Sequence, residues 1–310
     1  MKDEFYQKLR ENLRQDQILV EEPLANHTTF RIGGPSRFLL LPETKEQIAF
    51  AVKLCENENM PYYIIGNGSN LLVSDKGYSG TIIKLNKSFS SISITPSTEE
   101  GDKYLVHAQA GVLLSKLATT VAKAGLTGFE FAAGIPGTLG GAVTMNAGAY
   151  GGEIKDSIRS ATVLDEDYNI FTLSREELEL EYRSSIVQKK NYIVLEAEFV
   201  FESGDKDKIF EKIIDLNTRR HEKQPLEFPS AGSAFKRPKG YYAGKLIMDC
   251  DLRGFQIGGA QVSTKHCGFV INTGSATALD IRNLLLEIRR IVYEKYNVML
   301  EPEVKMLGEF

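Results

Sequence analysis

Cysteine is scarce in this sequence. The 310 residues include three cysteines, Cys55, Cys250 and Cys267, and no two of them form a C-x-x-C pair. An odd, widely spaced set argues against a disulfide framework and against a cysteine-based zinc site. Three reduced thiols are typical of a cytoplasmic protein, and no apolar run follows Met1 to suggest a secretory signal. We therefore expect a cytoplasmic location.

Histidine and excess positive charge are also lacking. The four histidines show no H-E-x-x-H spacing, so we expect no metal site. The formal net charge is −4, from 37 basic and 41 acidic residues, so no global field attracts nucleic acid or an acidic membrane. The hydrophobic share of 42% is that of a globular protein. We expect neither nucleic acid nor a membrane as a partner, and nothing in the sequence demands an oligomer, so we expect a monomer.

A long stretch without charge needs an explanation. Residues 131–152 carry no charged side chain over the length of a membrane span. Seven of these 22 residues are glycine and one is Pro136, so bulky apolar side chains are too few for lipid. The composition favours a glycine-rich loop instead.

Hydrophobic periodicity predicts alternating strands and helices, as in an α+β nucleotide-binding region. Ser203-Gly204-Asp205 looks like a domain boundary, and a helical pattern follows it. The predicted helices are the first twenty-odd residues up to Pro23, Lys45–Asn57 with Thr44 as N-cap, Ser115–Ala124 closed by Gly125, Lys206–His221 and Thr277–Tyr296. The predicted strands are Arg37–Leu41, Tyr62–Ile65, Thr81–Leu85, Tyr104–Gln109, a hairpin of Ser160–Asp165 with Ile170–Leu173, and Tyr192–Phe201.

Two glycine-rich segments, 66–71 and 134–142, have the composition of an anion cradle. Glycine allows backbone N–H groups to approach a pyrophosphate closely, and Ser69, Asn70 and Thr138 add side-chain donors. The first segment lacks the third small residue of a Rossmann loop, because Leu71 stands in its place. No G-K-[ST] follows either segment, so neither is a Walker A loop. Two purely structural turns are the alternative.

The stretch 219–245 is basic, with seven Lys or Arg residues against two acids. Ser233 lies in it between small residues, so its hydroxyl is accessible, and nearby cations suit a phosphorylated substrate. A solvated basic face is the plainer alternative, and a single-stranded nucleic-acid surface is a third. Taken singly, Arg183 and Glu303 are ordinary surface charges. No spacing assigns a His and an Asp to Ser233 as a hydrolase triad.

Together these pieces resemble the UDP-N-acetylenolpyruvoylglucosamine reductase family over nearly the whole chain. The resemblance rests on the order and completeness of seven segments. They are Asn26–Gly34, Ile65–Leu72, Gly134–Ala142, Asn146–Gly151, Tyr182–Ser185, Ala231–Lys236 and Leu300–Val304.

The resemblance implies an enzyme that reduces an enolpyruvyl ether. The family converts UDP-N-acetylglucosamine enolpyruvate to UDP-N-acetylmuramate for peptidoglycan synthesis, with NADPH as reductant and non-covalent FAD as hydride carrier. Arg183 and Glu303 would stabilise the enolate-like intermediate, and Ser233 would donate the proton. The residues implied for FAD are Gly66, Asn67, Gly68, Ser69, Asn70, Leu71, Gly134, Ile135, Pro136, Gly137, Thr138, Gly140, Gly141, Ala142, Asn146, Ala147 and Gly148.

The family also implies an architecture. An FAD-binding region in two parts, of the vanillyl-alcohol-oxidase type, would occupy 1–85 and 86–202, and an α+β substrate domain would occupy 203–299. The tail 300–310 would return to the active site. The implied substrate contacts are Tyr182, Arg219, Lys223, Lys236, Arg237 and His266. Arg237 and His266 stand where some members have asparagine and glutamine.

The chain resembles the shorter subtype, which lacks an inserted loop with a capping tyrosine after the strand 192–201.

Two alternative functions stay open from the sequence. An oxidase with the same flavin fold would keep both glycine segments without needing Arg183, Ser233 and Glu303. A non-catalytic nucleotide-sugar binding module would need no flavin at all.

Overall fold

The computed structural model describes residues 4–98 and 101–310. The chain folds into two compact units, and it passes between them repeatedly. Unit 1 comprises residues up to Leu19, Leu39–Asn67 and Thr81–Arg219. Unit 2 comprises Val20–Phe38, Gly68–Gly80 and Arg220–Phe310. The predicted boundaries at residues 85, 202 and 299 remain a proposal about functional domains.

A four-stranded sheet of order β1-β2-β5-β3 carries the early part of the chain. Its strands are β1 (Ile18–Pro23), β2 (Pro35–Leu40), β5 (Tyr78–Lys84) and β3 (Tyr62–Ile65). The chain passes from one unit to the other along β1, β2 and β5. Helix α2 (Lys45–Asn57) begins at Thr44, whose hydroxyl accepts the N–H of Gln47, and ends before Pro61.

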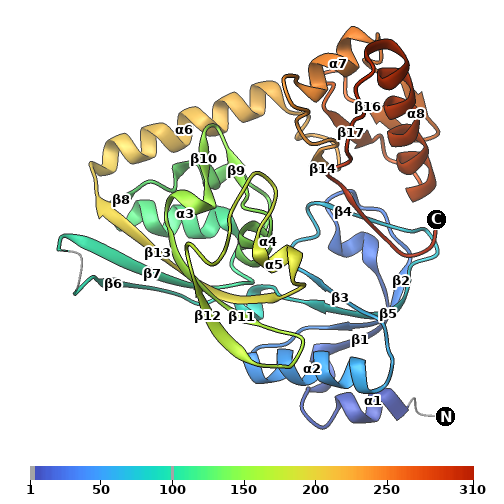
Figure 1. The fold of residues 1–310 in the computed structure, drawn as a ribbon. Coiled ribbons are helices and arrows are strands. Elements are labelled where there is room, and N and C mark those ends of the chain that lie inside the picture. The colour runs from blue at the N-terminus through green and yellow to red at the C-terminus, as the bar shows by residue number, and fades with distance from the viewer. Residues whose placement is uncertain (1–3, 99–100) are drawn as a thin grey trace. The chain divides into compact units, whose positions relative to one another are not determined.

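The larger sheet of unit 1 has the order β12-β11-β13-β7-β6, with β8 also paired to β13. Alternate residues of β13 are buried, which is the period of a strand with one covered face. Helix α4 packs against β13 and β7, and α3 packs against β8 (Figure 1). The strands are β6 (Ile92–Pro96), β7 (Lys103–Gln109), β8 (Leu126–Thr127), β11 (Ile158–Leu164), β12 (Ile170–Ser174) and β13 (Ile193–Ser203).

The remaining elements of unit 1 are short, apart from α3 and α6. The helices are α1 (Glu4–Leu9), α3 (Leu114–Lys123), α4 (Leu139–Thr144), α5 (Ile186–Lys189) and α6 (Lys206–Lys223), whose last turn belongs to unit 2. The paired strands are β9 (Gly148–Ala149) and β10 (Gly152–Glu153). Within residues 4–98 and 101–310 of both units, the 3-10 turns are η1 (Gln15–Gln17), η2 (Leu24–His27), η3 (Lys87–Phe89), η4 (Glu130–Gly134) and η5 (Ile154–Asp156).

Unit 2 is a sheet of order β14-β17-β16-β15 with α7 and α8 beside it (Figure 1). Its core brings Phe30, Ile32 and Leu72 together with residues of 231–304. A parallel pair joins β18 to β4, so the end of the chain completes this unit. The elements are β4 (Leu71–Val73), β14 (Ser230–Ser233), α7 (Ala243–Asp249), β15 (Gln256–Ile257), β16 (Ala260–Val262), β17 (Phe269–Asn272), α8 (Ala278–Tyr296) and β18 (Lys305–Leu307).

The structure confirms the α+β class and most predicted elements, but the predicted N-terminal helix is wrong. Residues 1–3 lie outside the described part of the chain, α1 ends at Leu9, and β1 occupies Ile18–Pro23. Phe5 and Leu9 bury one face of the short helix, whereas Ile18 and Val20 join a sheet that suits β-branched residues. Tertiary pairing thus outweighs the polar helical pattern there.

The charge-free stretch 131–152 is broken by η4, α4, β9 and β10, as its glycine content predicts. Among the helices of the described residues, none is long and apolar enough to cross a membrane.

Candidate functional site

The two glycine-rich segments contact each other within unit 1. A Cβ added to Gly66 would lie 1.9 Å from Oγ1 of Thr138, so no larger residue fits there. The side chain of Asn67 donates a hydrogen bond to the carbonyl of Pro136 at 2.6 Å. The first segment follows β3 directly, and the second leads into α4. The fold therefore brings together two segments that lie about 70 positions apart.

The first segment has backbone donors to offer. In the part of the chain that the structure describes, the N–H groups of residues 67–70 have no hydrogen-bond acceptor. Gly68 has φ +61°, and a Cβ there would lie 2.1 Å from the carbonyl oxygen of His27. A glycine-dependent loop with unsatisfied N–H groups fits the pyrophosphate of a dinucleotide cofactor.

The second segment is held by the chain that leads into α3. Leu139 and Gly140 donate their N–H groups to the carbonyls of Val112 and Ala110, at 2.8 and 2.9 Å. Leu114 in turn donates to the carbonyl of Gly137 at 3.0 Å. A Cβ on Gly140 would lie 2.9 Å from that of Ala110, whereas one on Gly141 would meet no atom within 4 Å. Gly140 thus faces the protein, and Gly141 faces open space.

Arg183 lies in a tight turn of unit 1. Glu181 and Ser184 exchange backbone hydrogen bonds of 3.1 and 3.2 Å, and Arg183 between them has φ +55°. The next residue, Ser185, is fully buried, and its hydroxyl donates to the carbonyl of Thr144 at the end of α4. The guanidinium lies 5.1 Å from the ring centroid of Tyr182. The turn that presents Arg183 is therefore attached to the end of α4.

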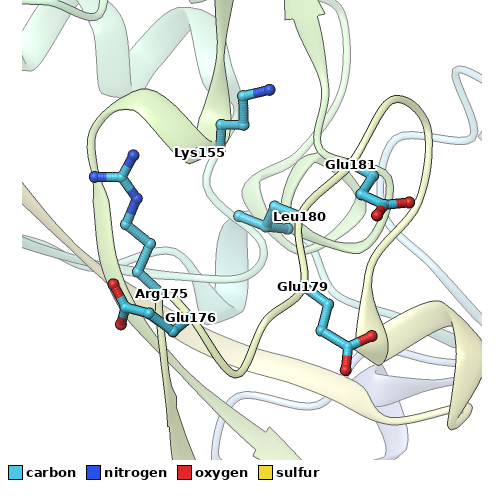
Figure 2. A pocket seen from close by; sticks show the side chains of 6 residues that line it. All are labelled: Lys155, Arg175, Glu176, Glu179, Leu180 and Glu181. Atoms are coloured by element: carbon cyan, nitrogen blue, oxygen red, sulfur yellow. The ribbon is translucent and has the colours of Figure 1, made fainter.

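A pocket of about 430 Å³ adjoins this turn. Its lining comes from η5 and from the segment that follows β12, and Glu181 belongs to both the pocket and the Arg183 turn (Figure 2). The two cations of the lining are accompanied by three carboxylates, so the pocket has no strong preference for an anion. The lining residues are Lys155, Arg175, Glu176, Glu179, Leu180 and Glu181.

Ser233 stands at an irregular place in the edge strand of unit 2. The register of β14 against β17 shifts between Ser230 and Ser233, and Gly232 between them has φ +74°. Ala231 and Ala234 are buried on either side, whereas Ser233 is exposed. The left-handed glycine and the bulge together leave the hydroxyl accessible, as the small neighbours predict.

The C-terminal segment brings Glu303 next to this strand. The N–H of Glu303 donates to the carbonyl of Ala234 at 2.9 Å, and its own carbonyl accepts from the Asn70 side chain at 3.1 Å. Lys305 then donates its N–H to the carbonyl of Asn70, where β18 begins beside β4. Glu303 is 9% exposed. Within unit 2, the structure thus brings together Ser233, Glu303 and part of the first glycine-rich segment.

The predicted substrate residues are distributed over both units. Arg219 pairs with Asp215 on α6, four positions before Lys223. Lys236 pairs with Glu301, and its N–H donates to the Glu301 carbonyl at 2.9 Å, so this lysine is tied to the C-terminal segment. β13 ends at residue 203 and α6 begins at residue 206, which leaves no room for an inserted loop, as the shorter subtype requires.

Two other predicted contacts have aromatic neighbours in unit 2. The Arg237 guanidinium lies 4.4 Å from the ring centroid of Tyr242. His266 packs edge-on against Phe269. Burial lowers the pKa of His266, and its Nδ1 accepts the N–H of Gly268 at 3.0 Å. A neutral ring therefore carries its proton on Nε2 as a hydrogen-bond donor, which is how the amide of glutamine could also act.

Sequence reasoning missed one carboxylate, Glu153, which lies close to Arg183. Glu153 pairs with Lys155 at 3.0 Å and accepts from Asn146 at 2.8 Å. The Lys155 ammonium lowers the pKa of Glu153, and the Asn146 amide and the charge of Arg183 lower it further. Glu153 directly follows the glycine-rich run, which is the one signal that could have drawn attention to it. No cluster of metal-ligating side chains lies within the described residues.

The fold and the paired glycine-rich segments define a flavoprotein of the FAD-binding class. A family model described as "FAD binding domain" matches residues 36–174. A glucose oxidase variant of Phl p 4 shares the fold with a TM-score of 0.51 at 11% identity, over 66% of this chain and 45% of that one. The match to this model agrees with the lack of a Rossmann loop in the first glycine-rich segment.

Closer relatives identify the family. A second family model, "UDP-N-acetylenolpyruvoylglucosamine reductase, C-terminal domain", matches residues 224–307. The reductase of Lachnoclostridium phytofermentans is 53% identical over 100% of this chain and 99% of its own. The crystal structure of the Thermus caldophilus reductase has a TM-score of 0.77 at 34% identity, over 94% of this chain and all of that one. The chain belongs to the UDP-N-acetylenolpyruvoylglucosamine reductase family.

Membership confirms the predicted enzyme and cofactors. The protein is an FAD-dependent oxidoreductase of peptidoglycan synthesis, with NADPH as reductant and the enolpyruvyl UDP-sugar as substrate. The two glycine-rich segments fit FAD by their close approach to each other and by the N–H groups of residues 67–70, which have no acceptor within the described residues. The individual roles predicted for the site residues remain proposals.

Proposed function

We propose that Arg183, Ser233 and Glu303 carry out the acid–base and electrostatic part of the reduction. When bound, the flavin supplies the hydride that the amino-acid side chains cannot. Hydride addition to the terminal vinyl carbon leaves negative charge on the carbon that bears the carboxylate. Arg183 offers a planar pair of donors to that carboxylate, and Glu303 completes the stabilisation through a proton or a water.

Ser233 would then donate its hydroxyl proton to the charged carbon, which completes the saturated lactyl ether. A hydroxyl is a weak acid, but an enolate is a strong acceptor and positioning offsets part of the mismatch. The observation that carries the proposal is the hydrogen bond of Glu303 to the carbonyl of Ala234, next to Ser233. It ties the proton donor and the carboxylate to one backbone frame in unit 2.

The substrate diphosphate would meet cations and hydrogen-bond donors. We propose contacts from Arg237 and Lys223, with neutral His266 as an Nε2 donor. Tyr182, Arg219 and Lys236 complete the proposed set. We further propose that the enzyme acts in the cytoplasm as a monomer, since no residue of the proposed site needs a second copy. The residues predicted for FAD remain the proposed cofactor contacts, except Asn146, whose two amide hydrogens are both bonded within the protein.

An anaerobic half-reaction experiment on Ser233→Ala tests the proton donor. Flavin reduction by NADPH should keep its rate, because no proton from Ser233 enters that step. Flavin reoxidation by UDP-N-acetylglucosamine enolpyruvate should slow on the order of 10²- to 10⁴-fold. Ser230→Ala, on the same strand, should leave both half-reactions unchanged.

The same half-reaction measurements also test the proton-donor role against two alternative functions, an oxidase and a non-catalytic binding module. Wild-type rates in both half-reactions of Ser233→Ala would refute the proton-donor role. A wild-type flavin that recovers its colour with oxygen and not with substrate would point to an oxidase. A protein that binds the UDP-sugar but takes up no FAD would be the non-catalytic module.

A further inference from the structure

The side chain of Asn146 is buried, and both its amide nitrogen and its amide oxygen form hydrogen bonds. It is 1% exposed, in unit 1, directly after the second glycine-rich segment and α4. Its Nδ2 donates to Oε2 of Glu153 at 2.8 Å and to the carbonyl of Glu181 at 3.1 Å. Its Oδ1 accepts the N–H of Lys155 at 3.0 Å. Both amide hydrogens are therefore used within the protein, so none is left to donate to a cofactor.

These hydrogen bonds end at the turn that carries Arg183. The Glu181 carbonyl that Asn146 binds belongs to the residue that closes the turn with Ser184. The Glu153 carboxylate that Asn146 also binds lies close enough to Arg183 for the guanidinium charge to lower its pKa. Asn146 thus holds both the backbone beneath Arg183 and a carboxylate that faces its charge.

The backbone explains why asparagine is suited to this place. Asn146 has φ +44°, in the left-handed region that asparagine tolerates better than most side chains. A buried amide with three partners is costly to replace, since each partner left without a hydrogen bond pays its own desolvation cost. These three hydrogen bonds give Asn146 a structural role that its place in the sequence does not show.

We propose that Asn146 is a positioning residue for Arg183, because it links the chain that follows α4 to the turn 181–184 that carries the guanidinium. The inference rests on the role proposed above for Arg183. Asn146 fixes the turn 181–184, and the turn fixes the guanidinium where the substrate carboxylate develops charge. Its effect belongs to the step that uses Arg183, and not to cofactor binding.

Asn146→Asp in the FAD-loaded enzyme tests this role. Aspartate keeps the shape, the left-handed backbone and an acceptor for Lys155, but it cannot donate when ionised. Reoxidation of the flavin by the enolpyruvyl substrate should slow on the order of 10- to 100-fold, because small misplacements cost this much. The flavin absorbance spectrum, the Kd for FAD and the rate of reduction by NADPH should stay within about twofold of wild type.

Two further variants keep the test decisive. Asn191→Asp changes an exposed asparagine of unit 1 that also has positive φ, and it should leave every rate unchanged. Asn146→Ser supplies one donor in place of two, so its rate should fall between those of wild type and Asn146→Asp. It also serves if the aspartate variant fails to fold.

A double-mutant comparison separates this inference from the proposed role of Arg183. In an Arg183→Ala background, Asn146→Asp should change the substrate half-reaction by less than about twofold, because the residue it positions is gone. An undiminished effect of Asn146→Asp in that background would refute the positioning role. An Arg183→Ala enzyme with wild-type rates would instead refute the role of Arg183. A weaker Kd for FAD or a shifted flavin spectrum in Asn146→Asp would make Asn146 a cofactor contact.

Discussion

Glu130 is a buried carboxylate of unit 1 that hydrogen bonds and an ion pair stabilise. Its side chain is 3% exposed, accepts from Thr127 and from the N–H of Gly128, and pairs with Lys212 at 3.2 Å. Burial raises the pKa of this carboxyl, but the hydrogen bonds and the Lys212 charge outweigh burial and leave the pKa below its ordinary value. The carboxylate thus stabilises the fold above the unfolded pKa of about 4.3, and this stability is lost as the pH falls through the lower folded pKa.

Glu130→Gln should therefore lower the free energy of unfolding at neutral pH by about 1–3 kcal/mol, since the amide cannot replace a charged acceptor. The deficit should shrink as the pH falls below about 4, where the wild-type carboxylate takes up its proton. Urea unfolding from pH 7 to about 3 measures both effects. Glu166→Gln, an exposed position, is the control and should change little. A deficit that stays constant with pH would contradict the argument.

Helix α4 contains two adjacent glycines, Gly140 and Gly141, which lie in different surroundings. Gly140 touches Ala110, so its missing side chain is required by packing. Gly141 is exposed and has no neighbour that a Cβ would meet, although glycine weakens a helix interior. A residue that costs stability without a packing reason points to a ligand on that face, and Gly141 is one of the proposed FAD contacts.

Gly141→Ala should stabilise the FAD-free protein by about 0.5–1 kcal/mol, because alanine is the better helix former. The same change should weaken FAD binding by about 10- to 100-fold, as the new methyl group meets the cofactor. Thermal unfolding without FAD and titration of flavin fluorescence measure the two effects. Gly140→Ala is the matched control and should destabilise the FAD-free protein by ~1–3 kcal/mol. Unchanged FAD affinity in Gly141→Ala would remove this residue from the cofactor site.

The elements that were predicted correctly depend on residues that are neighbours in the sequence. The alternation in β13, the N-cap of α2 and the glycine that follows α3 were readable because each depends on neighbours in sequence. The strand Ile18–Pro23 could not be predicted in this way, because its partners in the sheet lie elsewhere in the chain. In the same way, motifs indicated Arg183, Ser233 and Glu303. The bonds of Asn146 to Glu181 and of Asn70 to Glu303 depend on the fold and could be found only there.

At the scale of the whole molecule, unit 2 is larger than the matching C-terminal family model. That model covers 224–307, whereas the unit also includes Val20–Phe38 and Gly68–Gly80. Phe30, Ile32 and Leu72 from these early segments are buried in its core, and β4 pairs with β18. The C-terminal part of the chain therefore lacks essential core residues of its own unit.

A fragment of residues 220–310 should accordingly fail to fold alone. Three large apolar side chains and a strand partner are missing, and each buried side chain contributes about 1.5–3 kcal/mol, a large share of a small unit's stability. Circular dichroism and urea unfolding should show no cooperative transition. Co-expression with residues 1–219 serves as the control and should restore a folded complex. A cooperative transition in the isolated fragment would show that the early segments are dispensable.

The hydrogen bond between Asn70 and Glu303 joins residues 233 positions apart. A ribosome adds ~5–20 residues per second, so Glu303 is made roughly 10 to 50 s after its partner. During this time the β4 segment has no β18 strand to pair with, and Leu72 lacks the neighbours that bury it in the folded protein. Unpaired strand edges and exposed apolar side chains are features that promote aggregation and chaperone binding. The contact between the β4 segment and the segment that carries Glu303 can therefore form only after a long wait, because the two partners are 233 positions apart.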